Sequence, residues 1–234
     1  MDQARLKRIT DEPVRRGTRI KQTLLVLLVL IPCLFAAAQD PARFKTEIDS
    51  LRRLVIDNPG SKKVLLFTGS SSIRMWHDIQ EYFPDYCVIN TGFGGSHMSD
   101  LHFYLKDLVL QYQPGQVFIY EGDNDVAEGK GPGKIRRDAQ KVVSEISSSL
   151  PGVRISLIAP KPSLARWELR SEYGKVNRSL SAYAAREGID FIDVWPVMLG
   201  PDGTPLEDIF IEDGLHMNGK GYKLWAAEIS KYIK

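Results

Sequence analysis

The chain contains the segment VLLFTGSSSIR, residues 64–74, in which a continuous apolar run ends in a glycine and three serines. A short apolar run that ends in glycine and small hydroxyl residues, and then becomes helical, predicts a strand, a tight turn and a helix. Such a turn places a serine hydroxyl at the carboxyl end of a buried strand. Because ligands bind at that end of the strands in open parallel sheets, we expect this turn to belong to a functional site.

A second segment, DGLH at residues 213–216, supplies the group that such a serine needs. A serine hydroxyl is a weak nucleophile unless a base removes its proton, and a histidine oriented by a carboxylate commonly does so. Asp213 and His216 can provide this pair on one short loop. The sequence therefore predicts that two segments far apart along the chain meet in space.

Apolar runs alternate with helical patterns along the whole domain. We expect strands at residues 64–68, 87–90, 116–120, 154–159 and 190–194, and helices at 73–82, 99–111, 134–150, 172–186 and 221–232. An amphipathic helix is also expected at 41–54. This alternation predicts an α/β fold with a parallel sheet covered by helices on both faces. Right-handed crossovers then bring the carboxyl ends of all strands to one edge.

Polar residues follow every expected strand, as an active site at that edge requires. The clusters are GSSS at residues 69–72, TGFGGSH at 91–97, EGDND at 121–125, PKPSLARW at 160–167 and DVWP at 193–196. Since the strand ends share one edge, these clusters should lie together.

Three of these clusters and the segment at residues 213–216, taken in order, resemble the four sequence blocks of the SGNH (GDSL-type) hydrolase family. They are Gly69-Ser70-Ser71, the glycine cluster that ends at Gly95, Gly122-Asp123-Asn124-Asp125, and Asp213-x-x-His216. Each motif alone is weak, but four in this order, each in its expected place, form a specific signal over about residues 62–230. The resemblance implies a flavodoxin-like three-layer α/β/α sandwich with a five-stranded parallel sheet. It also implies ester hydrolysis through a serine, with no cofactor and no metal.

The resemblance also implies a role for individual residues. Ser71 takes the place of the nucleophile, His216 that of the general base, and Asp213 that of the acid that orients the histidine. The backbone N–H of Gly95 and the side-chain amide of Asn124 match the donors of the oxyanion hole, and the N–H of Ser71 is expected as a third donor. Fixed donors are needed there because the tetrahedral intermediate of acyl transfer carries negative charge on oxygen.

One position departs from the family pattern, because Ser70 stands where the first block usually has aspartate. Three consecutive serines also leave Ser70 and Ser72 as alternatives to Ser71 for the nucleophile. A purely structural alternative is that the serines only cap a helix that begins at Ile73.

Other residues compete for these roles. His77, His97 and His102 are the alternatives to His216, with His97 expected to line the pocket if it takes part, and Asp193 is the alternative to Asp213.

Residues 160–167 add a prediction about substrate binding. Arg166 and Trp167 are candidate substrate contacts, because arginine pairs with or stacks on ligands and tryptophan is a large surface to place on a loop. The alternative is a solvated loop with a half-buried tryptophan.

A metal site is the less favoured interpretation of the carboxylates after the strands. Glu121, Asp123, Asp125 and Asp213 are residue types that suit calcium or magnesium, but their spacing matches no known loop motif. A serine–histidine mechanism needs no metal, so we expect none.

The N-terminus has the pattern of a secretory signal peptide. Residues 1–22 carry seven Lys/Arg, and the apolar run at residues 24–38 ends in Ala36-Ala37-Ala38. The run is interrupted by Pro32 and is short for a bilayer span of about 20 residues. We therefore expect residues 1–38 to be a cleaved signal and residues 39–234 to be a secreted or periplasmic hydrolase domain without a stable membrane span. An uncleaved membrane anchor is the alternative.

Composition excludes some partners of this domain. Removing residues 1–38 leaves 24 basic and 26 acidic side chains, near −2 in net charge against +2 for the whole chain, so no nucleic-acid partner is indicated. Cys87 is then the single cysteine and cannot form an intrachain disulfide. The sequence makes no prediction of the oligomeric state.

The predicted function is hydrolysis of short acyl esters, acetyl esters foremost, of carbohydrates or small lipids. One alternative is a non-catalytic domain on the same fold that binds a small molecule or a carbohydrate. The other is a flavodoxin-like protein whose residues 69–72 bind a phosphate.

Overall fold

The structure is a computed structural model that describes residues 40–54 and 62–234. The expected signal peptide lies outside these residues. A five-stranded sheet forms the centre of the domain, and all of its strand pairs are parallel. Its order is β2-β1-β3-β4-β5, with β1 at Val64–Gly69, β2 at Cys87–Gly92, β3 at Gln116–Tyr120, β4 at Arg154–Ile158 and β5 at Asp190–Ile192. The predicted α/β fold with five parallel strands is confirmed.

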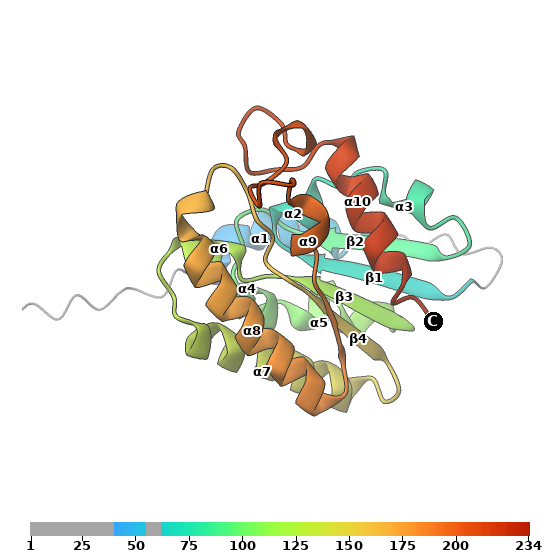
Figure 1. Cartoon of the computed structure of the whole chain (residues 1–234). Coiled ribbons are helices and arrows are strands. Elements are labelled where there is room, and N and C mark those ends of the chain that lie inside the picture. Colours follow the sequence, from blue (N-terminus) through green and yellow to red (C-terminus); the bar gives the residue numbers. More distant parts are fainter. Residues whose placement is uncertain (1–39, 55–61) are drawn as a thin grey trace, which may run out of the picture. The chain divides into compact units, whose positions relative to one another are not determined.

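Helices cover both faces of the sheet, as Figure 1 shows with α10 on one side and α7 and α8 on the other. One layer contains α1 (Lys45–Leu51), α4 (Met98–Phe103), α5 (Leu105–Leu108), α7 (Pro132–Ser149) and α8 (Arg170–Glu187). The other contains α2 (Ser71–Arg74), α3 (Ile79–Tyr82), α9 (Trp195–Met198) and α10 (Gly219–Ser230). The short α6 (Asp123–Ala127) follows β3.

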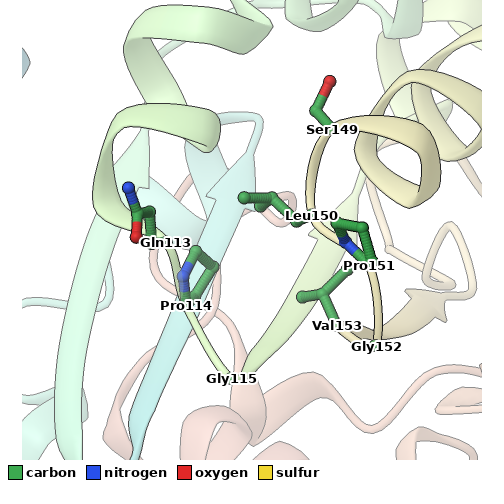
Figure 2. Close-up of a pocket in the computed structure, with 8 residues that line it drawn as sticks. All are labelled: Gln113, Pro114, Gly115, Ser149, Leu150, Pro151, Gly152 and Val153. Carbon is green, nitrogen blue, oxygen red and sulfur yellow. The ribbon is translucent and has the colours of Figure 1, made fainter.

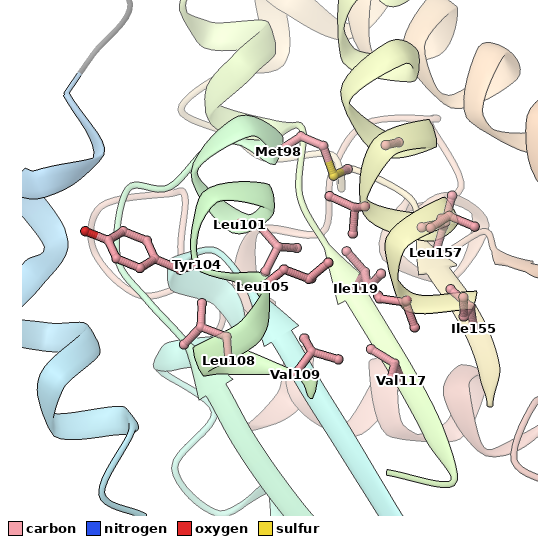
Figure 3. Close-up of a cluster of buried hydrophobic side chains, with 14 of the residues drawn as sticks. Met98, Leu101, Tyr104, Leu105, Leu108, Val109, Val117, Ile119, Ile155 and Leu157 are labelled. Carbon is pink, nitrogen blue, oxygen red and sulfur yellow. The ribbon is translucent and has the colours of Figure 1, made fainter. Parts of the chain in front are cut away.

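Alternate residues of each strand enter opposite cores, because side chains along a strand point to opposite faces. In β1, Leu66 packs in the core under α4, α5 and α7, whereas Leu65 and Phe67 pack in the core under α2, α3 and α10. Figure 3 shows the first of these cores, where side chains from α4 and α5 meet those of β3 and β4. All three β1 residues are fully buried, which explains why the strand is continuously apolar.

Two expected helices are each broken. Residues 73–82 form the separate helices α2 and α3, because Asn90 on β2 donates hydrogen bonds to the carbonyl oxygens of Ile73 and Trp76, at 2.7 and 3.3 Å. The expected helix at 99–111 is divided into α4, α5 and the 3₁₀ turn η2 (Leu110–Tyr112). The longer helices α7, α8 and α10 lie within about two residues of the predicted ranges.

The predicted amphipathic helix is present as the 3₁₀ turn η1 (Pro41–Phe44) followed by α1. Phe44 and Ile48 are buried in the core, as the helical spacing predicted. Tyr104 and Tyr112 fix the two ends of this segment, since their hydroxyls donate to the carbonyl oxygens of Pro41 and Leu51, at 2.9 and 2.5 Å. Across residues 40–54 and 62–234, no helix combines the length and the apolar character needed to cross a membrane.

Figure 2 shows a pocket of about 480 Å³ at the edge where β3 and β4 begin. It is lined by Gln113, Pro114, Gly115 and by residues 149–153, none of which carries a charge. Because parallel strands begin at this edge and end at the other, the pocket lies opposite the polar clusters. The chemistry of the domain belongs to the other edge.

Candidate active site

The turn after β1 is built on a glycine that no other residue can replace without strain. Gly69 has φ +119°, and a Cβ there would lie 2.0 Å from the carbonyl oxygen of Tyr120. This close approach lets the N–H of Ser70 donate to the same oxygen at 3.0 Å, so the turn is attached to β3. Ser71 follows as the first residue of α2. Gly92 gives α2 similar room, because a Cβ there would lie 2.3 Å from the backbone nitrogen of Arg74.

Ser71, His216 and Asp213 are hydrogen-bonded in series. Ser71 Oγ lies 2.8 Å from His216 Nε2, although the two residues are 145 positions apart. His216 Nδ1 lies 2.5 Å from Asp213 Oδ2. A carboxylate can only accept, so Nδ1 carries the proton and Nε2 is free to accept the proton of Ser71. The structure thus brings together the three residues that the sequence predicted to meet.

The loop that carries Asp213 and His216 is held by its own backbone. Oδ1 of Asp213 accepts from the N–H groups of Leu215 and His216 at 2.8 and 2.9 Å. Partial burial would raise the pKa of Asp213, but the hydrogen bonds from the side chain and backbone of His216 and from Leu215 lower it to about 2. Asp213 is therefore ionised at any pH near neutral, as the orientation of His216 requires.

Two backbone N–H groups are available beside Ser71. Among the described residues none accepts a hydrogen bond from the N–H of Ser71 or of Gly95. Gly95 has φ +74°, and apart from Gly95 and its two chain neighbours no described residue lies within 4 Å of the position that its Cβ would take. Unpaired N–H groups are suited to binding an anionic oxygen.

The carboxamide of Asn124 is oriented by contacts on both of its ends. Its Nδ2 donates to Ser70 Oγ at 2.8 Å and to the carbonyl oxygen of Ser96 at 2.9 Å. Its Oδ1 accepts from a guanidinium nitrogen of Arg166 at 3.1 Å. At the position where the resembling family usually has aspartate, Ser70 therefore still presents an acceptor to this amide.

A buried ionic cluster lies next to Asn124. Asp123 accepts from Lys161 at 3.2 Å, from Arg166 at 2.5 Å and from the hydroxyls of Tyr120 and Tyr173. Burial alone would raise the pKa of Asp123, but the two cations and the two hydroxyls hold it well below its usual range. Burial lowers the pKa of Lys161, whose side chain is fully enclosed, and Asp123 offsets only part of this effect.

A second buried carboxyl group, Glu121, supports the loop that carries Gly95. Ser96 Oγ lies 2.6 Å from Glu121 Oε1 and 3.1 Å from the carbonyl oxygen of Phe93. Burial, reinforced by the neighbouring charge of Asp125, raises the pKa of Glu121 well above its usual value. A protonated Glu121 also fits the geometry, because Ser96 has one hydroxyl proton for Phe93 and can accept the second hydrogen bond from Glu121.

The alternative histidines have other partners. His97 is buried and lies 3.1 Å from Asp100, His102 lies 3.1 Å from Glu145, and His77 is exposed. Asp193, the alternative acid, is also exposed, and its carboxylate accepts from the backbone N–H of Trp195 at the surface.

Trp167 is half-buried, with its ring 6.0 Å from that of Trp195, beside the Arg166 that reaches Asn124. The substrate contacts predicted for Trp167 and Arg166 stay predictions.

The carboxylates that suggested a metal site are each engaged separately. Asp125 accepts from Lys130 and from the backbone of Met98, while Asp123 and Asp213 are bound as described above. Within residues 40–54 and 62–234 no group of three or more His, Cys, Asp or Glu side chains is arranged to hold a metal ion.

Sequence reasoning did not find Lys161 or the two tyrosines of the cluster around Asp123. Lys161 lies three residues after the end of β4, between two prolines, and a lysine this close to the end of a buried strand was the available signal. Lysine is so seldom fully buried that a lysine in a sequence is normally interpreted as a surface residue.

A serine, a histidine and an aspartate hydrogen-bonded in series at the carboxyl edge of a parallel sheet are typical of the α/β serine hydrolases. The chain belongs to the GDSL-like lipase/acylhydrolase family, whose model matches residues 57–224. It is an ester hydrolase of that family. No curated protein matches the chain.

Solved structures share the fold at low sequence identity. A GDSL-like lipase from Bacteroides thetaiotaomicron is 21% identical, with 82% of this chain and 96% of that chain covered and a TM-score of 0.65. An acetylxylan esterase from Geobacillus stearothermophilus is 18% identical, with 74% of this chain and 94% of that chain covered and a TM-score of 0.62. A lipase/acylhydrolase from Enterococcus faecalis is 21% identical, with 73% and 95% covered and a TM-score of 0.59. These structures are SGNH-type hydrolases, as the sequence motifs predicted.

Proposed function

We propose that the chain hydrolyses short acyl esters through the series Ser71, His216 and Asp213. The hydrogen bond of 2.8 Å between Ser71 Oγ and His216 Nε2 is the observation that carries this proposal. His216 removes the proton of Ser71 as Oγ attacks the ester carbonyl, and it then gives that proton to the departing alcohol. Water attacks the acyl-enzyme next, with His216 again as the base, and the acid is released.

The oxyanion forms beside the N–H groups of Ser71 and Gly95 and the amide of Asn124. One amide hydrogen of Asn124 is held by the carbonyl of Ser96. The other points to Ser70 Oγ, a hydroxyl that can yield this hydrogen to a negatively charged oxygen. Donors fixed before the reaction stabilise the transition state without reorganisation.

The proposed substrates are acetyl or similarly short esters of carbohydrates or small lipids. The structural neighbour from Geobacillus stearothermophilus is described as an acetylxylan esterase. Catalytic mutants of that protein replace an aspartate and a histidine three positions apart, which is the spacing of Asp213 and His216.

The proposed site of action is outside the cytoplasm, after removal of residues 1–38. The basic and apolar pattern of these residues supports export, although they lie outside the described part of the chain. Mass analysis of the exported protein is expected to find an N-terminus near Gln39. A mature protein that begins at Met1 would contradict cleavage.

The test of the serine compares three neighbouring variants of the full-length chain, Ser71→Ala, Ser70→Ala and Ser72→Ala. A fluorophosphonate probe should label all but Ser71→Ala, and hydrolysis of p-nitrophenyl acetate should be lost in that variant alone. Ser72→Ala is the matched control, since Ser72 is a buried neighbouring serine in the same helix. Full activity in Ser71→Ala would refute the proposal, and a domain that only binds esters would show no labelling at all.

A further inference from the structure

We propose that Arg166 is a positioning residue that fixes the orientation of the Asn124 carboxamide and thereby aims its N–H at the oxyanion. The inference rests on the proposed function, because it concerns the same reaction. The carboxamide of asparagine can rotate by half a turn, which exchanges its oxygen with its NH₂ group. In the wrong orientation Oδ1, an acceptor, would face the negative oxygen of the intermediate.

Two contacts favour the observed orientation: the carbonyl oxygen of Ser96 accepts from Nδ2 at 2.9 Å, and Arg166 donates to Oδ1. The guanidinium donates to Oδ1 at 3.1 Å, and a guanidinium has no acceptor to offer an NH₂ group. Rotating the carboxamide would therefore place its NH₂ group against the N–H groups of the guanidinium, so that donors would face donors. A hydrogen bond from a charged donor favours the observed orientation by roughly tenfold to a hundredfold.

Asp123 holds Arg166 in place for this role. One guanidinium nitrogen donates to Asp123 Oδ1 and the other to Asn124 Oδ1, so a single planar group connects two consecutive residues of α6. Asp123 is itself fixed by Lys161 and by the hydroxyls of Tyr120 and Tyr173. The side chain of Arg166 is 20% exposed, so its position is set mainly by these contacts and little by solvent.

Lysine cannot substitute for arginine in this arrangement. Its ammonium group is a point charge, whereas the two contacts of Arg166 require a flat group with donors on separate nitrogens. Arg166→Lys should keep a cation beside Asp123 and lose the control of Asn124. Arg166→Met should lose both, while Asp123 keeps Lys161 as its buried partner.

The test is a double-mutant cycle in the full-length chain with p-nitrophenyl acetate as the substrate. We expect Arg166→Met and Arg166→Lys to lower kcat by about tenfold or more. This loss should be smaller than the loss of about two to three powers of ten that accompanies complete removal of an oxyanion donor. KM should change less than about twofold, because an interaction realised only in the transition state is lost. In the Asn124→Ala background, Arg166→Met should cost no more than about a further twofold.

Arg186→Met is the control, since Arg186 is an exposed arginine near the end of α8 and its loss should leave kcat unchanged. A rise in KM with unchanged kcat would overturn the inference and make Arg166 a substrate contact. The inference would also be overturned if Arg166→Met lowered kcat by the same factor in the wild-type and the Asn124→Ala backgrounds. If Arg166→Met fails to fold, Arg166→Lys carries the same comparison. Activity that persists in Ser71→Ala would refute the proposed function instead, so the two failures are distinguishable.

Discussion

The two sides of the proposed active site hold an aspartate in opposite ways. Asp213 is 43% exposed and is fixed by two backbone N–H groups of its own loop and by His216. Asp123, behind Asn124, is 7% exposed and is fixed by two cations and two tyrosine hydroxyls. At Asp213, a carboxylate that stays partly exposed orients His216. At Asp123, a carboxylate and its two cationic partners are buried in the protein. The same substitution should therefore affect mainly activity at Asp213 and mainly folding at Asp123.

Asp213→Asn should have the largest effect on catalysis. An asparagine can still accept the two backbone hydrogen bonds, but it no longer stabilises the required tautomer of His216 or the imidazolium, so kcat should fall about 10⁴-fold. The thermal midpoint should shift little, because the side chain is partly exposed and screened by solvent. The measurements are p-nitrophenyl acetate hydrolysis and thermal unfolding of the same preparation. Loss of the folded state would remove the contrast between the two sides.

Asp123→Asn should show the reverse balance. Removing the buried carboxylate leaves Lys161 and Arg166 without their counter-charge, which should lower the free energy of unfolding by about 3–5 kcal/mol. Urea unfolding measures this change. The matched control is Asp202→Asn, a surface aspartate that also accepts from a backbone N–H and whose replacement should leave the midpoint unchanged.

A double variant tests whether the unpaired cations cause the loss of stability in Asp123→Asn. Adding Lys161→Met to Asp123→Asn removes one of the two stranded cations and should restore part of the lost stability. If Asp123→Asn is as stable as the wild-type protein, the cluster contributes no net stability. The two aspartates would then not differ in their effect on stability.

Asn124→Ala should fall between these two cases. The change removes one of the proposed oxyanion donors, and kcat should fall by about two to three powers of ten with little change in KM. It also leaves Arg166 with Asp123 as its main partner, so stability should fall only slightly. Steady-state kinetics and urea unfolding check both expectations, and a KM effect without a kcat effect would remove Asn124 from the oxyanion hole.

The sequence predicted the part of this site that depends on strand ends. Ser71 and Asn124 each lie in a motif just after a strand, and parallel topology brings such places together. His216 lies in a loop well beyond β5, and its motif was recognised from the family resemblance. The broken helix at residues 73–82 could not be predicted, because Asn90 ends it from another strand. The apolar pattern at these residues is helical on both sides of the break.

The buried cluster was out of reach for a different reason. Asp123 and Lys161 are 38 positions apart, and neither belongs to a pattern that predicts their contact. A charged residue in a sequence is normally an exposed one, and a buried pair is visible only when both partners are placed. Arg166 was recognised as a candidate for substrate contact, but its contacts with Asp123 and Asn124 required the coordinates.

Glu121→Gln should have the smallest effect. It extends the comparison to a third acid, whose pKa is raised by burial instead of lowered by its partners. Burial raises the pKa of Glu121, so the folded protein keeps a proton that the unfolded chain releases above about pH 4. Folding then takes up a proton, and stability falls as the pH rises toward the folded pKa, by at most about 1.4 kcal/mol per pH unit. Glutamine mimics the protonated acid, since its NH₂ group can donate to Ser96 Oγ.

Urea unfolding of both proteins between pH 4 and pH 8 measures this difference. The two should be similar in stability at the acidic end, and Glu121→Gln should become the more stable protein as the pH rises. Esterase activity of the variant should stay close to that of the wild-type protein, because Ser96 keeps its hydrogen bond to Asn124. Parallel stability profiles would mean that Glu121 is ionised in the folded state. Ser96 would then donate its hydroxyl proton to Glu121, and the carbonyl of Phe93 would lose the partner it has in the protonated arrangement.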